Sequence, residues 1–206
     1  MSRLRIALVG VILLCGLGVA SANDDELAIK QRSDQVVSGH NGFEDKVRAL
    51  RQYVHDKMKL SSMGLNPDQV NALSPIQKLD SGLGGYCSQQ ADVFMQLAQK
   101  QGITTRLVHL FCAGQPSSCH TIAEAFDGNR WVIVDTMFDL ELKNASGQMA
   151  SRDDVTNDLQ IIRRTPNIKE LIQEYPERWE HNEEWLKIYS AWSPFCVKYV
   201  LRGETN

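Results

Sequence analysis

The strongest constraint on the fold is the stretch HTIAEAFDGNRWVIVD, in which two runs rich in branched and aromatic residues flank Asp127-Gly128. Asp-Gly between two such runs is the strongest short-range signal for a β-hairpin, because both central residues of a type I′ turn need positive φ. The sequence therefore predicts two antiparallel strands, over residues 120–126 and 129–136.

The same hairpin brings a histidine and an aspartate together. A two-residue turn at Asp127-Gly128 puts His120 directly opposite Asp135 on one face of the sheet. Directly opposed residues have Cβ atoms ~5 Å apart, so Asp135 can accept a hydrogen bond from imidazole Nδ1–H and leave Nε2 free. A slip of one residue in this register would separate the pair.

A cysteine stands where the sequence predicts the start of a helix. In GGYCSQQADVFMQLAQKQGI, residues 84–103, apolar residues recur at helical spacing after Cys87, and Gly102 can end the helix. The helix dipole and a neighbouring imidazolium both lower the pKa of a thiol below its usual ~8.5. If this helix packs its N-terminus against the strand of His120, then Cys87, His120 and Asp135 are a nucleophile, a base and an orienting residue.

These blocks, GGYCSQQADVFMQLAQKQGITTRLV and HTIAEAFDGNRWVIVD with the spacing between them, resemble the transglutaminase-like domain of the papain-like fold over residues 43–138. The resemblance implies an α+β fold, with N-terminal helices packed on an antiparallel sheet. It also implies a Cys87, His120 and Asp135 triad that transfers acyl groups through a thioester. We expect no metal ion or cofactor.

Three threonines depart from the family pattern. Thr104, Thr121 and Thr136 stand where the family often has a proline, an aromatic residue and a proline. All three lie beside the triad, so they bear on the substrate class more than on the chemistry.

The N-terminus resembles a secretory signal peptide over residues 1–22. Arg3 and Arg5 precede an apolar run over residues 6–20, and Ala20-Ser21-Ala22 is a typical cleavage site. The apolar run is shorter than the ~20 residues of a membrane-spanning helix, so an uncleaved anchor is the alternative. The sequence therefore predicts a periplasmic or secreted protein without a membrane span after cleavage.

Residues 23–206 have the length of one domain, with the core at 43–138 and a helical, aromatic-rich extension at 139–206. Residues 23–42 show no clear periodicity and are predicted to be a loose lead-in. A helix is expected from Phe43, with Asn41 as its cap and Glu44 completing a capping box. The net charge of −3 and the absence of a basic run give no sign of nucleic-acid binding.

Several cysteines and polar residues also have structural or metal-binding interpretations. Cys112 and Cys119 bracket a short loop, and in an exported protein they are predicted to form a disulfide, although with His109 and His120 they could bind zinc instead. Cys87 itself could be a buried core thiol. On the predicted register Glu124 lies opposite Trp131, and both are expected to be structural, Trp131 as a core aromatic residue; the alternative for Glu124 is to orient the substrate or the histidine.

Taken together, the sequence predicts an exported cysteine-dependent amide hydrolase or acyltransferase, similar to a protease or amidase, that acts on a protein or peptide. Backbone N–H groups near Cys87 would stabilise the oxyanion, and Gln77 and Gln89 are candidate side-chain donors. The alternative is a catalytically inactive binding or scaffold protein of the cell envelope.

Overall fold

The computed structural model describes residues 22–59, 66–111, 118–166, 187–189 and 199–202. Helices make up most of the N-terminal half: α1 (Ala22–Val36), α2 (Phe43–Met58), α3 (Pro67–Asn71), α4 (Pro75–Asp80) and α5 (Cys87–Gln99). Strands follow: β1 (Thr105–Phe111), β2 (Ser118–Phe126) and β3 (Trp131–Val134). The C-terminal part contributes α6 (Arg152–Asn157), α7 (Gln160–Arg163), the 3₁₀ helix η1 (Lys187–Tyr189) and β4 (Tyr199–Arg202). The predicted α+β class is therefore confirmed.

The four strands form one antiparallel sheet in the order β3-β2-β1-β4. The predicted hairpin is present between β2 and β3, but its register is two residues away from the predicted one. Phe126 lies opposite Trp131, and Glu124 lies opposite Ile133. The predicted pairs of Glu124 with Trp131 and of His120 directly across from Asp135 are therefore wrong.

The cause of the shift is the conformation of the loop. Asp127 is the first residue of a longer turn, and its Oδ1 accepts hydrogen bonds from the backbone N–H groups of Asn129 and Arg130. The Asp127 N–H in turn donates to the Arg130 carbonyl oxygen. Aspartate side chains often close turns in this way, and the resulting loop of four residues replaces the expected turn of two.

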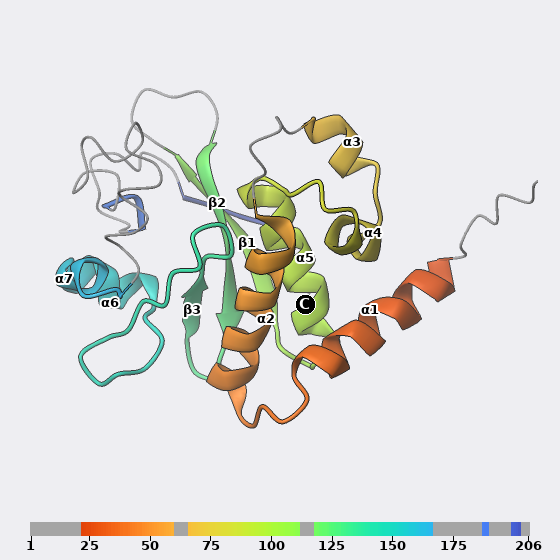
Figure 1. Cartoon of the computed structure of the whole chain (residues 1–206). Coiled ribbons are helices and arrows are strands. Elements are labelled where there is room, and N and C mark those ends of the chain that lie inside the picture. Colours follow the sequence, from red (N-terminus) through yellow and green to blue (C-terminus); the bar gives the residue numbers. More distant parts are fainter. Residues whose placement is uncertain (1–21, 60–65, 112–117, 167–186, 190–198, 203–206) are drawn as a thin grey trace, which may run out of the picture.

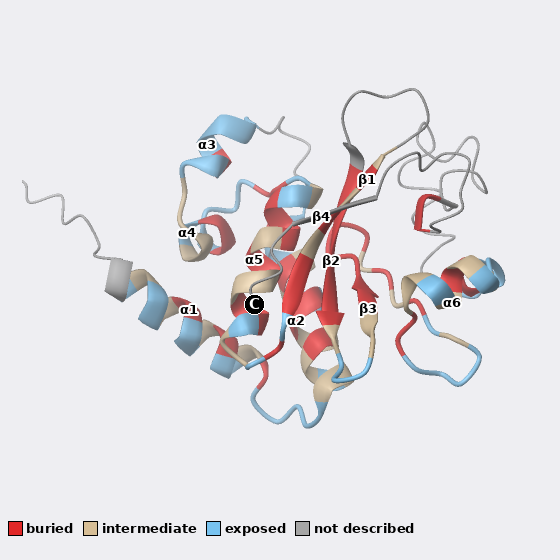
Figure 2. Cartoon of the chain, turned by 180° about the vertical axis from the view of Figure 1, so that it is seen from behind, coloured by how far each residue is buried: buried red, intermediate tan, exposed pale blue. Residues whose placement is uncertain are grey.

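The two faces of the sheet are covered by different parts of the chain (Figure 1). Helices α2 and α5 pack against one face, where β2 presents Ala123 and Ala125. The segment from residue 137 to 162 and η1 cover the other face, where β2 presents His120, Ile122 and Glu124. Figure 2 shows that β1 and β2 are mostly buried between these two layers.

The N-terminal region is more ordered than the sequence predicts. Residues 22–36 are helical rather than a loose lead-in, and α1 packs on α5. Ile29 is buried there, and the buried hydroxyl of Ser33 donates to the Leu97 carbonyl oxygen at 2.8 Å. Because the buried face of α1 includes a serine and few apolar residues, its helical periodicity is not visible in the sequence.

Helix α2 begins at Phe43 as predicted and buries the expected apolar stripe, but its predicted cap is wrong. Gly42 is the N-cap residue, with φ of 85°, and it makes no side-chain capping bond. Glu44 instead accepts a hydrogen bond from the Met149 N–H at 3.0 Å. The carboxylate is therefore used to hold a distant segment against α2.

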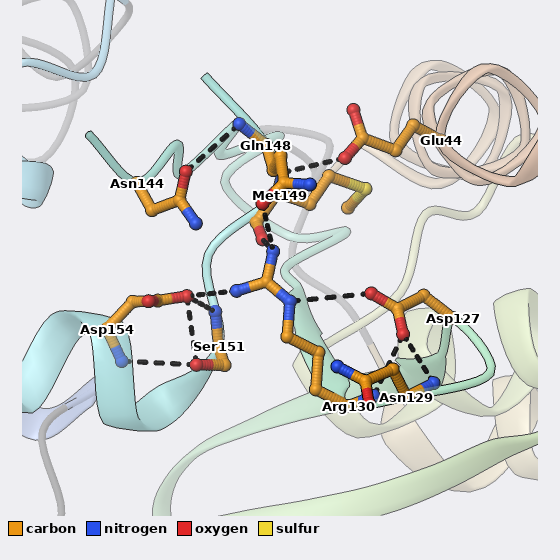
Figure 3. Close-up of polar contacts among 9 residues, drawn as sticks. All are labelled: Glu44, Asp127, Asn129, Arg130, Asn144, Gln148, Met149, Ser151 and Asp154. Atoms are coloured by element: carbon orange, nitrogen blue, oxygen red, sulfur yellow. Dashed lines mark hydrogen bonds and ion pairs between the residues drawn. The ribbon is translucent and has the colours of Figure 1, made fainter. Parts of the chain in front are cut away.

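Polar contacts attach residues 136–154 to the rest of the fold. Arg130, in the hairpin loop, donates to Asp154 at 2.5 Å and to the Met149 carbonyl oxygen at 2.9 Å (Figure 3). From α2, Arg51 donates to Asp139 at 2.6 Å, and His55 Nδ1 lies 3.0 Å from the Thr136 carbonyl oxygen. These contacts fix the chain segment that follows β3, and Asp135 is the first residue of that segment.

No helix in the described ranges combines the length and the apolar character needed to cross a membrane. Residues 1–21 of the predicted leader, the predicted Cys112–Cys119 disulfide and Cys196 lie outside the described residues.

Candidate active site

Cys87 is the first residue of α5, and the chain before it is held tightly against α2. The Gly85 N–H donates to the Met58 carbonyl oxygen at 3.0 Å, and the buried amide of Gln90 donates to the Gly85 and Met58 carbonyl oxygens. A Cβ on Gly85 would lie 2.5 Å from the Met58 side chain, so glycine permits this close approach. Cys87 is thus fixed at the helix N-terminus by contacts of Gly85, two residues before it, and of Gln90, three residues after it.

The thiol lies beside the part of β2 that precedes its pairing with β3. Strand β3 pairs with residues 123–126 of β2, so residues 118–122 of β2 extend beyond the end of β3. The Phe126 N–H points to β1, where it bonds the Thr104 carbonyl oxygen, and N–H directions alternate along a strand. The Thr121 N–H therefore points away from β1, and it donates a hydrogen bond to the Cys87 sulfur.

His120 connects the thiol to a carboxylate. The imidazole is 1% exposed, and its Nε2 lies 2.6 Å from Asp135 Oδ2. The ring also makes a hydrogen bond with the Cys87 side chain, for which Nδ1 is the remaining nitrogen. The sequence-based expectation for the two ring nitrogens is therefore reversed, because Asp135 reaches His120 from beyond the end of β3 and not from directly across.

The size of the register shift, two residues, explains why His120 and Asp135 are still in contact. Side chains alternate between the faces of a strand, so a shift by an even number of residues keeps His120 and Asp135 on the same face. Asp135 follows β3 directly and pairs with Leu140 in an isolated bridge, which turns the chain back. The turn brings the carboxylate diagonally to His120.

Asp135 is fully buried and accepts three hydrogen bonds. Besides His120, the Phe138 N–H donates to Oδ1 at 3.0 Å and the Tyr189 hydroxyl donates to Oδ2 at 2.5 Å. The rings of Phe138 and Tyr189 also contact the imidazole, with centroid distances of 5.0 Å and 6.1 Å. Sequence reasoning did not identify Tyr189, because no local pattern connects η1 with residues more than fifty positions earlier.

The charges of these groups depend on one another. Burial raises the pKa of the Cys87 thiol, but the hydrogen bond and positive charge of His120, with the Thr121 N–H, lower it below its usual value. Burial lowers the pKa of His120, whereas the charge of Asp135 and the hydrogen bond to it raise it to about 10. The arrangement therefore favours a thiolate and an imidazolium side by side.

The same coupling acts on the carboxylate. Burial raises the pKa of Asp135, but the charge of His120 and the hydrogen bonds from His120, Tyr189 and the Phe138 N–H lower it below its usual value. Asp135 is thus an anion throughout the range in which a thiol and an imidazole titrate.

Glu124 and Trp131 are structural, as expected, but in a different arrangement. Glu124 is 1% exposed and pairs with Arg106 of β1, whose Nε lies 2.7 Å from Glu124 Oε2. Arg106 stacks on Trp131, with 4.1 Å between its guanidinium carbon and the ring centroid. Trp131 is only half-buried, so it covers an ion pair rather than filling the core.

The two candidate oxyanion donors have other partners. Gln77 Oε1 accepts from the Ser74 N–H and completes a capping box of α4. Gln89 Oε1 accepts from the Tyr86 N–H, and its amide donates to Asn71 Oδ1 at 2.8 Å. Both side chains therefore cap or connect helices, and the backbone N–H groups at the start of α5 are the donors that the geometry offers.

Among the residues that the structure describes, the site offers no metal-binding cluster. Within the part of the chain that the structure describes, no group of three or more His, Cys, Asp or Glu side chains could hold a metal ion. The alternative zinc site falls largely outside that part, since it includes Cys112 and the side chain of Cys119. A cavity of about 340 Å³ beside the sheet is lined by described residues, among them Glu124 and Trp131, and its lining includes neither Cys87 nor His120.

Comparison with known proteins agrees with the resemblance seen in the sequence. A family model described as the transglutaminase-like superfamily matches residues 30–136, which includes Cys87, His120 and Asp135. A search of curated proteins finds no match.

Two solved structures are similar in part. One is a protein named as a candidate cysteine protease from Cytophaga hutchinsonii, with 18% identity and a TM-score of 0.45 over 60% of this chain. The other is named as a candidate protease from Parabacteroides distasonis, with 11% identity and a TM-score of 0.43 over 53% of this chain. The chain spans 40% and 23% of the lengths of these two proteins.

Proposed function

Because this chain belongs to the transglutaminase-like superfamily, we propose that it is an exported cysteine-dependent amide hydrolase or acyltransferase that acts on protein or peptide substrates. The observation that carries the proposal is the continuous contact from the Cys87 thiol through His120 to the buried Asp135. Nucleophile, base and orienting residue within hydrogen-bond reach of one another are the arrangement that covalent catalysis requires.

In the first step the Cys87 thiolate attacks the carbonyl carbon of a substrate amide. A carbon–sulfur bond forms, and the carbonyl oxygen becomes an oxyanion that backbone N–H groups at the start of α5 can stabilise. As the tetrahedral species collapses, the carbon–nitrogen bond breaks. The His120 imidazolium gives its proton to the leaving amine, which departs and leaves a thioester on Cys87.

In the second step neutral His120 takes a proton from a nucleophile, which attacks the carbonyl carbon of the thioester and forms a new bond to it. As this second tetrahedral species collapses, the carbon–sulfur bond breaks and Cys87 leaves as a thiolate beside the His120 imidazolium. If the nucleophile is water, the products are a carboxylic acid and the free enzyme; if it is a primary amine, a new amide forms. Asp135 stabilises the imidazolium in both steps and holds the ring so that Nδ1 faces the sulfur. In a wet compartment hydrolysis is the default outcome, which favours a protease or amidase over a cross-linking enzyme.

Export is proposed from the sequence of residues 1–22. A basic start, an apolar run of fifteen residues and an Ala-x-Ala site are the three parts of a secretory signal. Its test is the N-terminal sequence of the protein recovered from the periplasm or the medium, and an N-terminus at Met1 would contradict it.

The catalytic assignment is tested by the rate at which iodoacetamide alkylates Cys87 as a function of pH, measured by mass spectrometry of the Cys87 peptide. The lowered pKa predicts rapid alkylation of Cys87 at pH 6, where an ordinary thiol reacts slowly. His120→Ala should abolish this reactivity, whereas His40→Ala, an exposed histidine, should not change it. Slow alkylation of the wild-type protein at pH 6 would instead support an inactive binding role.

A further inference from the structure

The geometry points to Tyr189 as a positioning residue for the proposed reaction: its hydroxyl holds the Asp135 carboxylate in place and shares the oxygen that His120 uses. This inference rests on the proposed function, because it assigns Tyr189 a role in the same site. Tyr189 lies outside residues 30–136, the part that matches the family. The chain beyond the family match would thus contribute the Tyr189 hydroxyl to the site, in addition to Phe138, which also lies outside residues 30–136.

Tyr189 is buried and makes specific contacts with the triad, unlike a residue that packs on the surface. Its side chain is 1% exposed, and its hydroxyl lies 2.5 Å from Asp135 Oδ2. The ring meets the imidazole of His120 edge-on, at an interplanar angle of 80°. The neighbouring Ile188 is fully buried in the apolar cluster on this face of the sheet. The apolar cluster therefore fixes η1, and η1 in turn fixes the hydroxyl.

A tyrosine hydroxyl is suited to this position. The carboxylate is fully buried, and a buried charge is tolerated only when it is well supplied with hydrogen-bond donors. Burial, together with the charge of Asp135, raises the pKa of Tyr189 well above its usual value. The hydroxyl therefore remains a donor over the whole pH range in which Cys87 and His120 change their charge.

The shared oxygen gives the contact a predictable effect on His120. Asp135 Oδ2 accepts from both His120 and Tyr189. A hydrogen bond from the hydroxyl withdraws charge from that oxygen, so it weakens the attraction between the carboxylate and the imidazolium. Removing the hydroxyl while keeping the ring should strengthen that attraction, and the imidazolium should lose its proton at a higher pH.

Among the described residues, the hydrogen-bond partner of the Tyr189 hydroxyl is Asp135. Asp135 and Cys87 are the charged groups that act on Tyr189, and His120 faces its ring. Helix α6 and strand β1 also pack against η1, and they carry the following charged or titratable side chains: Arg152, Asp153, Asp154, Arg106 and His109. Asp154 is paired with Arg130, and Arg106 is paired with Glu124.

The test is an NMR titration of the ¹³C-labelled histidine ring of His120 in the full-length protein. In Tyr189→Phe the deprotonation midpoint should move up by about half a pH unit, the size expected for one hydrogen bond. Site-specific replacement of Tyr189 by 3,5-difluorotyrosine, a stronger donor of the same shape, should move it down. Tyr53→Phe is the matched control, since the Tyr53 hydroxyl accepts a hydrogen bond from Arg32 far from the site.

The two variants separate positioning from simple packing. A hydroxyl that only filled space would leave the midpoint unchanged in both variants, and either an unchanged midpoint or a downward shift in Tyr189→Phe overturns the inference. If Tyr189→Phe does not fold, the fluorinated protein still tests the role of Tyr189, because it retains the ring and the hydroxyl. Failure of the proposed function would appear separately, as slow alkylation of wild-type Cys87 at pH 6.

Discussion

The two faces of the sheet are formed by the same strands but bury different kinds of side chain. Toward α2 and α5, the strands present small and branched apolar residues, among them Ala123, Ala125 and Val134. Toward η1 and α6, the same strands present Ile122 and Ile133 but also bury His120 and Glu124. We refer to these as the helix face and the histidine face.

The difference shows how the fold combines stability with chemistry. Apolar burial on the helix face stabilises the protein without a desolvation cost, and it fixes α5, whose first residue is Cys87. On the histidine face, the charged groups are buried in pairs: His120 with Asp135, and Arg106 with Glu124. Such pairs contribute little net stability. In the pair of His120 with Asp135, however, the mutual attraction shifts the pKa values of both groups, which a catalytic site requires.

The largest effect is expected from Asp135→Asn on the histidine face. Without the carboxylate the pKa of His120 falls, so the imidazolium no longer supplies the hydrogen bond and the charge that lower the pKa of Cys87. The direct effect of Asp135 on the thiol has the opposite sign but is the smallest of the causes. Activity should fall by up to ~10⁴.

The pH profile checks the reason for that loss. Because the thiolate forms only at higher pH in Asp135→Asn, the acid limb of the Cys87 alkylation rate should move upward. Asp127→Asn, in the hairpin loop, is the matched control and should leave the limb in place. An unchanged limb in Asp135→Asn would mean that another group orients His120.

A smaller effect is expected for the second charged pair on the histidine face. Glu124→Leu leaves Arg106 buried without its carboxylate, which should lower the free energy of unfolding by about 3–5 kcal/mol. The double substitution Arg106→Leu and Glu124→Leu removes both charges and should recover most of the loss. Urea denaturation of the three proteins measures this, and equal losses in the single and double variants would contradict the pairing argument.

On the helix face we expect a comparable or somewhat smaller loss without any effect on chemistry. Leu97→Ala removes a fully buried side chain of α5 and should cost about 3 kcal/mol by leaving a cavity. The alkylation rate of Cys87 per folded molecule should stay the same. Leu27→Ala, at a position that is 57% exposed, is the control. A changed alkylation profile in Leu97→Ala would show that the two faces are not independent.

The smallest effect is expected at the edge of the histidine face. Arg130→Ala removes the contacts to Asp154 and Met149 that attach the segment after β3 to the hairpin loop (Figure 3). Because the guanidinium is about one-quarter exposed, the loss should be about 1 kcal/mol. Thermal unfolding measures it. A loss larger than that of Leu97→Ala would mean that this network, rather than the apolar cluster, holds the covering layer.

Local sequence patterns predicted the elements that carry the proposed chemistry. Alternation around Asp127-Gly128 indicated the hairpin, and helical periodicity after Cys87 indicated α5. The same patterns missed α1, whose buried face includes Ser33, and they missed α4 (Pro75–Asp80). Periodicity is informative only where a segment buries enough apolar residues to reveal it.

The sequence by itself determined that His120 and Asp135 share a face of the sheet, because side-chain direction along a strand is a local property and a shift of two residues preserves it. Only the tertiary structure decided the rest. The side chain of Asp127 set the hairpin register, the turn after β3 set which nitrogen of His120 meets the carboxylate, and packing of η1 brought Tyr189 to Asp135. Each of these depends on a specific hydrogen bond or a contact between distant segments, and neither leaves a periodic signal in the sequence.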